Sequence, residues 1–185
     1  MLIQETGLAG VRVIEIEKKG DERGYFARTF CEEEFGAAGL VTRFVQSSQS
    51  HNRRRGTVRG MHFQRPPHAE VKVVRVVRGA VWDVIIDLRE ESPSYGRWEG
   101  FDLSAENGRI LYIPEGFAHG FQTLEDDTDV TYQISRPHTP GMDGGVRWND
   151  PAFGITWPLE VSVIAAKDMA WPDADLAAGV FRPSE

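Results

Sequence analysis

The segment from residue 53 to residue 64 places several guanidinium groups beside a histidine. It reads Arg-Arg-Arg-Gly-Thr-Val-Arg-Gly-Met-His-Phe-Gln. The planar fork of arginine suits phosphate oxygens, and a histidine that titrates near neutral pH suits proton transfer. We interpret Arg53, Arg54 and Arg55 as a solvated loop, whereas the run after Arg59 predicts a strand that draws Arg59 toward a sheet. A lone histidine such as His62 is often only a buried structural group, so the polar residues around it must decide its role.

Histidine spacing also bears on metal binding. Residues 114–119 read PEGFAH and match the PxGxxH pattern of the second cupin motif. The first cupin motif would supply an HxH pair and a following Glu as ligands, but the chain contains no HxH. A three-histidine metal site is therefore poorly supported, and we expect no metal. A metal-dependent cupin enzyme that uses His62 and His119 as ligands remains an alternative.

Short runs rich in Val, Ile, Phe and Tyr are separated by Gly and Pro along most of the chain. Examples of runs that read as strands are 11–16, 71–77, 80–88, 109–113, 120–124 and 130–134. Regular short strands with turn signals between them predict an all-β sandwich or barrel. Helical periodicity is scarce and predicts only short helices, at 32–39 and 174–178.

A first hairpin is predicted where strands 71–77 and 80–87 flank an Arg-Gly pair, which suits a two-residue turn. Because side chains alternate along a strand, Lys72 and Asp83 then share one face as diagonal neighbours.

A second hairpin is predicted from strands 120–124 and 130–134, which flank a hydrophilic turn. With an even number of loop residues, His119 and Tyr132 line one face among apolar neighbours. A wall that mixes apolar groups with Lys, Asp, His and Tyr is costly unless it lines a wet or ligand-filled cavity. The two hairpins together predict a site inside a β barrel.

Composition limits the class of protein. The chain has 185 residues, 21 Lys and Arg, 28 Asp and Glu, and a net charge of −7, so we expect neither nucleic acid nor an anionic membrane as a partner. The single cysteine, Cys31, excludes an intrachain disulfide. No signal peptide or membrane-spanning run is evident, and we expect a cytoplasmic protein.

Several motifs occur together in one order along the chain. They include DERGYF at 21–26, RGMHFQ at 59–64, KVVR at 72–75, PEGFAHGF at 114–121 and WNDP at 148–151. This ordered set resembles the dTDP-4-dehydrorhamnose 3,5-epimerases, which are metal-independent cupin-fold enzymes of deoxysugar biosynthesis.

The resemblance implies a cupin-type jelly-roll barrel with short peripheral helices. We expect one domain over residues 1–185, with a C-terminal tail from about residue 159 packing on the barrel. It further implies a homodimer that needs no cofactor. The implied substrate is a nucleoside-diphosphate 4-keto-6-deoxyhexose, and the implied reaction inverts carbon 3, carbon 5 or both. The family's reaction converts dTDP-4-dehydro-6-deoxyglucose to dTDP-4-dehydrorhamnose.

The resemblance also assigns roles to individual residues. His62 matches the base, Asp168 the carboxylate that orients it, Lys72 the cation near the ketone oxygen, and Tyr132 the acid on the opposite face. Further positions match substrate contacts of the family: Arg23, Phe26, Gln46, Arg59, His119 and Lys167. Arg23 and Phe26 can come from the partner subunit in that family.

Four positions depart from the family pattern within the expected substrate site. Arg28 replaces a glutamate, Ser48 an asparagine, His138 a tyrosine, and Asp143 a glutamate. These changes bear on the fit of the nucleotide and the sugar. Arg28 and His138 also keep a third hypothesis open, a barrel that binds a sugar nucleotide without turnover.

Overall fold

The computed structural model describes residues 1–183, and most of its regular structure is β-strand. The strands are β1 (Leu2–Glu5), β2 (Arg12–Glu15), β3 (Lys19–Asp21), β4 (Gly24–Phe26), β5 (Gln46–Asn52), β6 (Thr57–Gln64), β7 (Lys72–Arg78), β8 (Ala80–Asp87), β9 (Trp98–Ser104), β10 (Ile110–Ile113), β11 (Phe117–Thr123), β12 (Thr128–Ile134), β13 (Asp143–Gly145) and β14 (Val163–Ile164). The helices are α1 (Glu32–Ala37) and α2 (Ala166–Met169). The predicted all-β class is confirmed.

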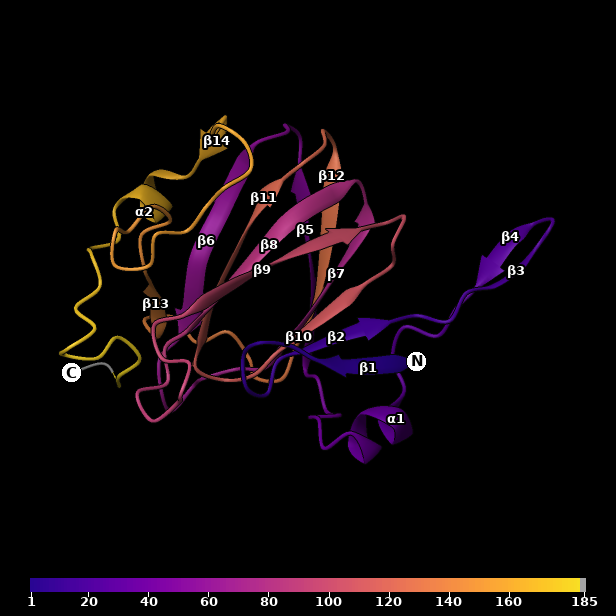
Figure 1. The fold of residues 1–185 in the computed structure, drawn as a ribbon, viewed down its shortest axis with the longest axis horizontal. Coiled ribbons are helices and arrows are strands. Elements are labelled where there is room, and N and C mark those ends of the chain that lie inside the picture. The colour runs from indigo at the N-terminus through magenta and orange to yellow at the C-terminus, as the bar shows by residue number, and fades with distance from the viewer. Residues whose placement is uncertain (184–185) are drawn as a thin grey trace.

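Two sheets face each other and enclose the core (Figure 1). The first sheet has the order β1-β2-β10-β7-β12-β5, and the second has the order β13-β6-β11-β8-β9, with β14 added parallel to β6. A small hairpin of β3 and β4 projects away from both sheets (Figure 1).

Alternation along the strands decides which side chains enter the barrel. On β8, Val81 and Ile85 point inward to a cluster that also contains Val74 of β7. The intervening Val84 and Ile86 point outward. A strand covered on both faces needs apolar residues at nearly every position, which explains the continuous apolar composition of β8.

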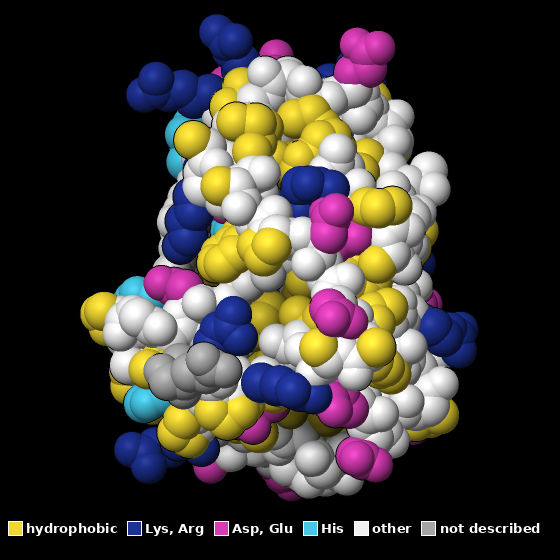
Figure 2. All heavy atoms as spheres, turned by 90° about the vertical axis from the view of Figure 1, so that its left-hand side faces the viewer, with side chains coloured by type: hydrophobic (Ala, Val, Ile, Leu, Met, Phe, Trp, Pro, Cys, Tyr) yellow, Lys and Arg dark blue, Asp and Glu magenta, His cyan; other side chains and the backbone are white. Residues whose placement is uncertain are grey.

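The outer faces of both sheets are partly covered. Trp157, Leu176 and Phe181, in the segment after β13, pack over the outer face of β6 and β8. Figure 2 views the side of the molecule that carries this segment, where apolar and charged side chains of both signs are intermingled. At the other sheet, Phe35 of α1 packs against Tyr112 of β10.

The two predicted hairpins are wrong as strand pairings. β7 pairs with β10 and β12, whereas β8 pairs with β9 and β11, so the Arg78–Gly79 turn crosses from one sheet to the other. In the same way β11 and β12 lie in different sheets. Each of these strands already has two long-range partners, and those pairings prevail over the local turn. The predicted inward faces are nevertheless correct, because alternation within each strand decides which side chains face the interior, whichever strand is its partner.

The helix predictions had mixed outcomes. The helix expected at 32–39 is present as α1, and Gly39 follows it with a φ of 71°. The helix expected at 174–178 is wrong, because these residues form only a turn, and the second short helix lies at 166–169 instead. There the Asp150 carboxylate accepts a hydrogen bond from the Ala174 N–H, which satisfies that donor outside any helix. No helix in the described part of the chain is long and apolar enough to cross a membrane.

Candidate active site

An irregularity in the pairing of β6 with β11 brings two site residues to the inner face. His62 lies opposite His119, and Arg59 lies opposite Phe121. The β11 residues are two apart and share a face, but the β6 residues are three apart, so β6 carries one extra residue at this point. In a regular strand Arg59 and His62 would point to opposite faces. The bulge turns both toward the interior.

His62 is held by a carboxylate from α2. Asp168 Oδ1 lies 2.7 Å from His62 Nε2, and Asp168 Oδ2 accepts a 3.1 Å hydrogen bond from the Gly60 N–H. Burial acts to raise the pKa of Asp168, but the His62 hydrogen bond and charge and the Gly60 N–H outweigh it, so the pKa is lowered. Asp168 is therefore ionised, and it orients the imidazole.

Tyr132 approaches the same interior from β12, in the facing sheet. Its ring centroid lies 6.1 Å from that of His119, in an edge-on arrangement. Burial raises the pKa of the Tyr132 hydroxyl well above its ordinary value, and the Asp83 carboxylate adds to the effect. The phenol therefore carries its proton at neutral pH.

His119 is paired with a buried carboxylate. Its Nε2 lies 2.9 Å from Asp83 Oδ2 and 3.0 Å from Oδ1. Burial raises the pKa of Asp83, while the charges of His119 and Lys72 act in the opposite direction. Lys72 thus acts on the Asp83 carboxylate across the barrel, from the facing sheet, rather than as a neighbour within one sheet.

One cavity of about 340 Å³ lies between these walls. It is lined by Ser50, Arg59, His62, His119, Gly120, Phe121, Tyr132, Ala165, Lys167 and Asp168. Arg59 is fixed at its edge, because its Nε donates a 2.6 Å hydrogen bond to Asn52 Oδ1. The imidazole of His62 and the phenol of Tyr132 therefore border a shared space from two different sheets.

A second cavity of about 200 Å³ also has His62 and Lys167 in its wall. Its remaining lining residues are Gln46, Phe63, Gln64, Glu70, Lys72, Ile134, His138 and Asp143. Lys72 Nζ lies 3.1 Å from Glu70 Oε1 and donates a 3.5 Å hydrogen bond to the His62 carbonyl oxygen, which fixes the amine beside His62. Gln46 Oε1 accepts a 2.8 Å hydrogen bond from the His138 N–H, which links these two expected contacts.

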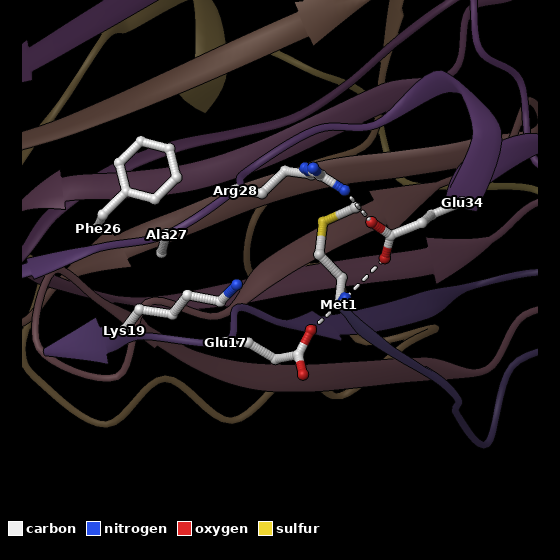
Figure 3. A pocket seen from close by; sticks show the side chains of 7 residues that line it. All are labelled: Met1, Glu17, Lys19, Phe26, Ala27, Arg28 and Glu34. Carbon is white, nitrogen blue, oxygen red and sulfur yellow. Dashed lines mark hydrogen bonds and ion pairs between the residues drawn. The ribbon is translucent and has the colours of Figure 1, made fainter.

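Three expected substrate contacts lie away from these two cavities. Arg23, in the turn between β3 and β4, forms a hydrogen-bonded ion pair with Asp21. Phe26 and Arg28 line a different pocket, in which Arg28 and the Met1 amino group both contact the Glu34 carboxylate (Figure 3). Within one chain these three residues do not meet His62.

Ser48 lines neither cavity, but it lies directly opposite Tyr132 in the pairing of β5 with β12. Three polar lining residues were not among the predicted site residues: Ser50, Gln64 and Glu70. Glu70 stands two positions before Lys72, and this spacing, which places both side chains on one face of an extended chain, was the available signal.

Two observations bear on the alternative that His62 and His119 are metal ligands. Each of His62 and His119 has its Nε2 engaged by a different carboxylate, on Asp168 and Asp83. Among residues 1–183, no group of three or more His, Cys, Asp or Glu side chains is arranged to hold a metal ion.

Comparison with known proteins places this geometry in a family. A family model described as dTDP-4-dehydrorhamnose 3,5-epimerase matches residues 5–175. The chain belongs to the dTDP-4-dehydrorhamnose 3,5-epimerase family. It is therefore an epimerase, an enzyme of the isomerase class, as the motif resemblance implied.

Individual epimerases are similar over most of their length. The protein from Methanothermobacter thermautotrophicus is 48% identical over 90% of this chain and 91% of its own. The one from Sinorhizobium fredii is 44% identical over 93% and 89%. A crystal structure of the Bacillus anthracis epimerase, with TDP and PPi bound, has a TM-score of 0.91 at 38% identity and covers 94% of this chain and 99% of that one. This structural likeness confirms the cupin-type jelly roll.

Proposed function

We propose that this chain inverts carbons 3 and 5 of dTDP-4-dehydro-6-deoxyglucose, forming dTDP-4-dehydrorhamnose, through an enolate and without a cofactor. One observation supports this most directly: an imidazole and a protonated phenol border one cavity from facing sheets. Such a pair can remove a proton from one face of a sugar ring and return one to the other.

His62 acts as the base. Its Nε2–H donates to Asp168, so Nδ1 carries the free electron pair. Nδ1 takes the proton from the carbon next to the ketone, and the electrons of that C–H bond move onto the ketone oxygen to give an enolate. Asp168 stabilises the imidazolium that forms.

Lys72 faces the developing negative charge. An ammonium fixed beside the reacting carbon lowers the energy of an enolate oxygen, most strongly where water is scarce. The Lys72 side chain is 15% exposed, which favours such an environment. Arg59 and Lys167 add positive charge around the cavities and suit the diphosphate.

Tyr132 acts as the acid. Its hydroxyl donates a proton to the enolate carbon from the face opposite His62, so the configuration at that carbon is inverted. The phenolate then recovers a proton, and the His62 imidazolium releases one, which restores the enzyme. The raised pKa of Tyr132 keeps the donor protonated until the enolate is present.

The nucleotide is held partly by a second subunit. Arg23 is exposed on the projecting β3–β4 hairpin, and the Phe26 side chain is 76% exposed, so both are available to a neighbouring chain (Figure 1). In a homodimer this hairpin contributes to the partner's site. Arg28, Ser48, His138 and Asp143 then adjust the fit of the nucleotide and the sugar.

Deuterium exchange tests the proposal. The protein is incubated in deuterated buffer with 4-keto-6-deoxyhexoses linked to dTDP, CDP or GDP, and deuterium at carbons 3 and 5 is measured by NMR. We expect exchange and inversion at both carbons with the dTDP sugar, and none in the His62→Ala variant with its fold intact. Absence of exchange with every nucleotide would contradict the proposed reaction, and undiminished exchange in the variant would contradict the role of His62.

A further inference from the structure

A buried carboxylate beside Lys72 is not used by the reaction described above. Glu70 lies just before β7, and its side chain is only 6% exposed. Its Oε1 is 3.1 Å from Lys72 Nζ, whereas its Oε2 is buried and has no hydrogen-bond partner among residues 1–183. A buried carboxylate oxygen without a donor is costly, so this atom indicates a missing partner.

The surroundings show where the missing donor would come from. Glu70 lines the cavity that also contains His62 and Lys72. The nearby Gln64 amide is already used, because its Nε2 donates to the carbonyl oxygens of His68 and Pro137. Lys167 Nζ lies 3.9 Å from an Asp143 carboxylate oxygen. No described side chain of the cavity wall donates to Glu70 Oε2, so a donor on the occupant of the cavity would satisfy it.

We infer that Glu70 Oε2 accepts a hydrogen bond from the hydroxyl on carbon 3 of the hexose, and that the site therefore selects 4-keto sugars that retain this hydroxyl. The inference rests on the proposed function, in which Lys72 faces the ketone oxygen on carbon 4. Of the two carbons next to the ketone, carbon 5 of a 6-deoxyhexose carries a methyl group and the ring oxygen. Carbon 3 carries the hydroxyl nearest to the ketone oxygen, and hence nearest to the Lys72–Glu70 pair.

The test compares one substrate pair on several variants. Exchange at carbon 5 is measured as kcat/KM for the dTDP-4-keto-6-deoxyhexose and for its 3-deoxy analogue, with wild type and with Glu70→Gln. We expect loss of the hydroxyl to cost wild type about tenfold or more, as for a hydrogen bond to a charged group. In Glu70→Gln the same loss should cost less than about threefold, because an amide oxygen is the weaker acceptor.

Because both substrates are assayed on each variant, a general loss of activity or a displaced Lys72 cancels in the ratio. Glu99→Gln is the matched control, since Glu99 Oε2 is also buried without a hydrogen-bond partner but lies beside Gly7, outside both cavities. Its ratio should equal that of wild type. Glu70→Asp, which keeps the charge but withdraws the oxygen, should also lower the ratio and serves if Glu70→Gln does not fold.

Failure of the proposed function and failure of the Glu70 assignment give different results. If wild type shows no exchange even with the 3-hydroxy substrate, the proposed function is wrong. If wild type exchanges both substrates equally, or if Glu70→Gln keeps the full wild-type preference, the proposed function stands and the assignment of Glu70 is overturned.

Discussion

At the scale of single residues, the proposed base His62 and the proposed acid Tyr132 lie on different walls of the cavity. Asp168 contacts Nε2 of His62, and in the proposed reaction the other ring nitrogen takes the proton. Burial keeps the proton on Tyr132, in the facing sheet. Because the two groups stand on different strands, each can be removed without altering the hydrogen bonds of the other. This independence lets the two halves of the proposed reaction be measured apart.

Replacing Tyr132 by Phe is expected to separate exchange from inversion. His62 can still remove the proton and return deuterium to the same face, so the recovered substrate gains deuterium. Product formation should fall by about a hundredfold or more, because the general acid is lost. NMR of the sugar reports both quantities. Tyr95→Phe is the control, since the Tyr95 hydroxyl contacts the carbonyl oxygen of Leu176, and product formation at the wild-type rate in Tyr132→Phe would remove Tyr132 from the acid role.

The lowered pKa of Asp168 predicts a pH-dependent contribution to stability. A carboxyl whose folded-state pKa is depressed stabilises the fold above its unfolded pKa of about 3.9, and this stabilisation is lost as the pH falls through the lower folded value. Asp168→Asn should therefore reduce the free energy of unfolding near neutral pH by about 2 kcal/mol, as expected for a hydrogen bond to a charged group. The difference should shrink in strong acid.

Urea denaturation of both proteins near neutral pH and at about pH 2 measures this difference across the folded and unfolded pKa values. Asp143→Asn is the comparison, because Asp143 is half-exposed and its ion pairs are 3.9 Å long. A gap between wild type and Asp168→Asn that is equal at both pH values would contradict the assignment of the effect to this carboxylate.

At the scale of strands, the site depends on how closely β6 and β11 approach at the bulge. A Cβ on Gly60 would lie 2.5 Å from the Gly120 Cα and 3.0 Å from the His119 carbonyl oxygen. Neither strand can carry a side chain there without moving. The same close approach sets the position of the Gly60 N–H that contacts Asp168. Strand packing and the orientation of the base are therefore linked.

Gly60→Ala compared with Gly24→Ala tests this link. Both glycines have nearly the same positive φ, 127° and 124°, but a Cβ on Gly24 would meet nothing within 4 Å. Because φ is nearly the same at both positions, the difference between the variants reports mainly the crowding at Gly60. We expect Gly60→Ala to lose about 2 kcal/mol more of the free energy of unfolding, measured by urea denaturation. Equal losses would show that the strands have room to adjust.

Strands with a clear apolar run, among them β7, β8 and β12, could be located from the sequence together with their inward faces, because both follow from composition and alternation within a single strand. The strands β5 and β9 were not predicted, since their sequences QSSQSHN and WEGFDLS carry no such run. It misplaced the partners of β7, β8, β11 and β12, because a short turn between two strands has the same local pattern whether the chain returns in one sheet or crosses to another. Most site residues were found through motif resemblance. Glu70 and the bulge at Gly60 were missed. The role of each depends on residues that only the folded chain brings close, the cavity wall for Glu70 and strand β11 for the bulge.

At the scale of the whole molecule, the projecting β3–β4 hairpin separates Arg23 and Phe26 from the cavities of their own chain (Figure 1). The aromatic side chains of Tyr25 and Phe26 are exposed to water on this two-stranded hairpin. Such exposed apolar surface favours burial against another chain. A symmetric dimer in which each hairpin reaches the other barrel would bury them and complete both nucleotide sites. The proposed activity would then require residues from two chains.

Mixing two inactive variants tests this arrangement. In a heterodimer of Arg23→Ala and His62→Ala, the Arg23→Ala chain keeps its own His62 and receives an intact Arg23 from its partner, so one complete site forms. We expect unfolding and refolding the two variants together to restore part of the epimerase activity, while each alone stays inactive. His62→Ala mixed with Tyr132→Phe is the control, because both residues line the cavity of one chain and no complete site can form. If the first mixture remains as inactive as the control, the hairpin does not serve the neighbouring barrel.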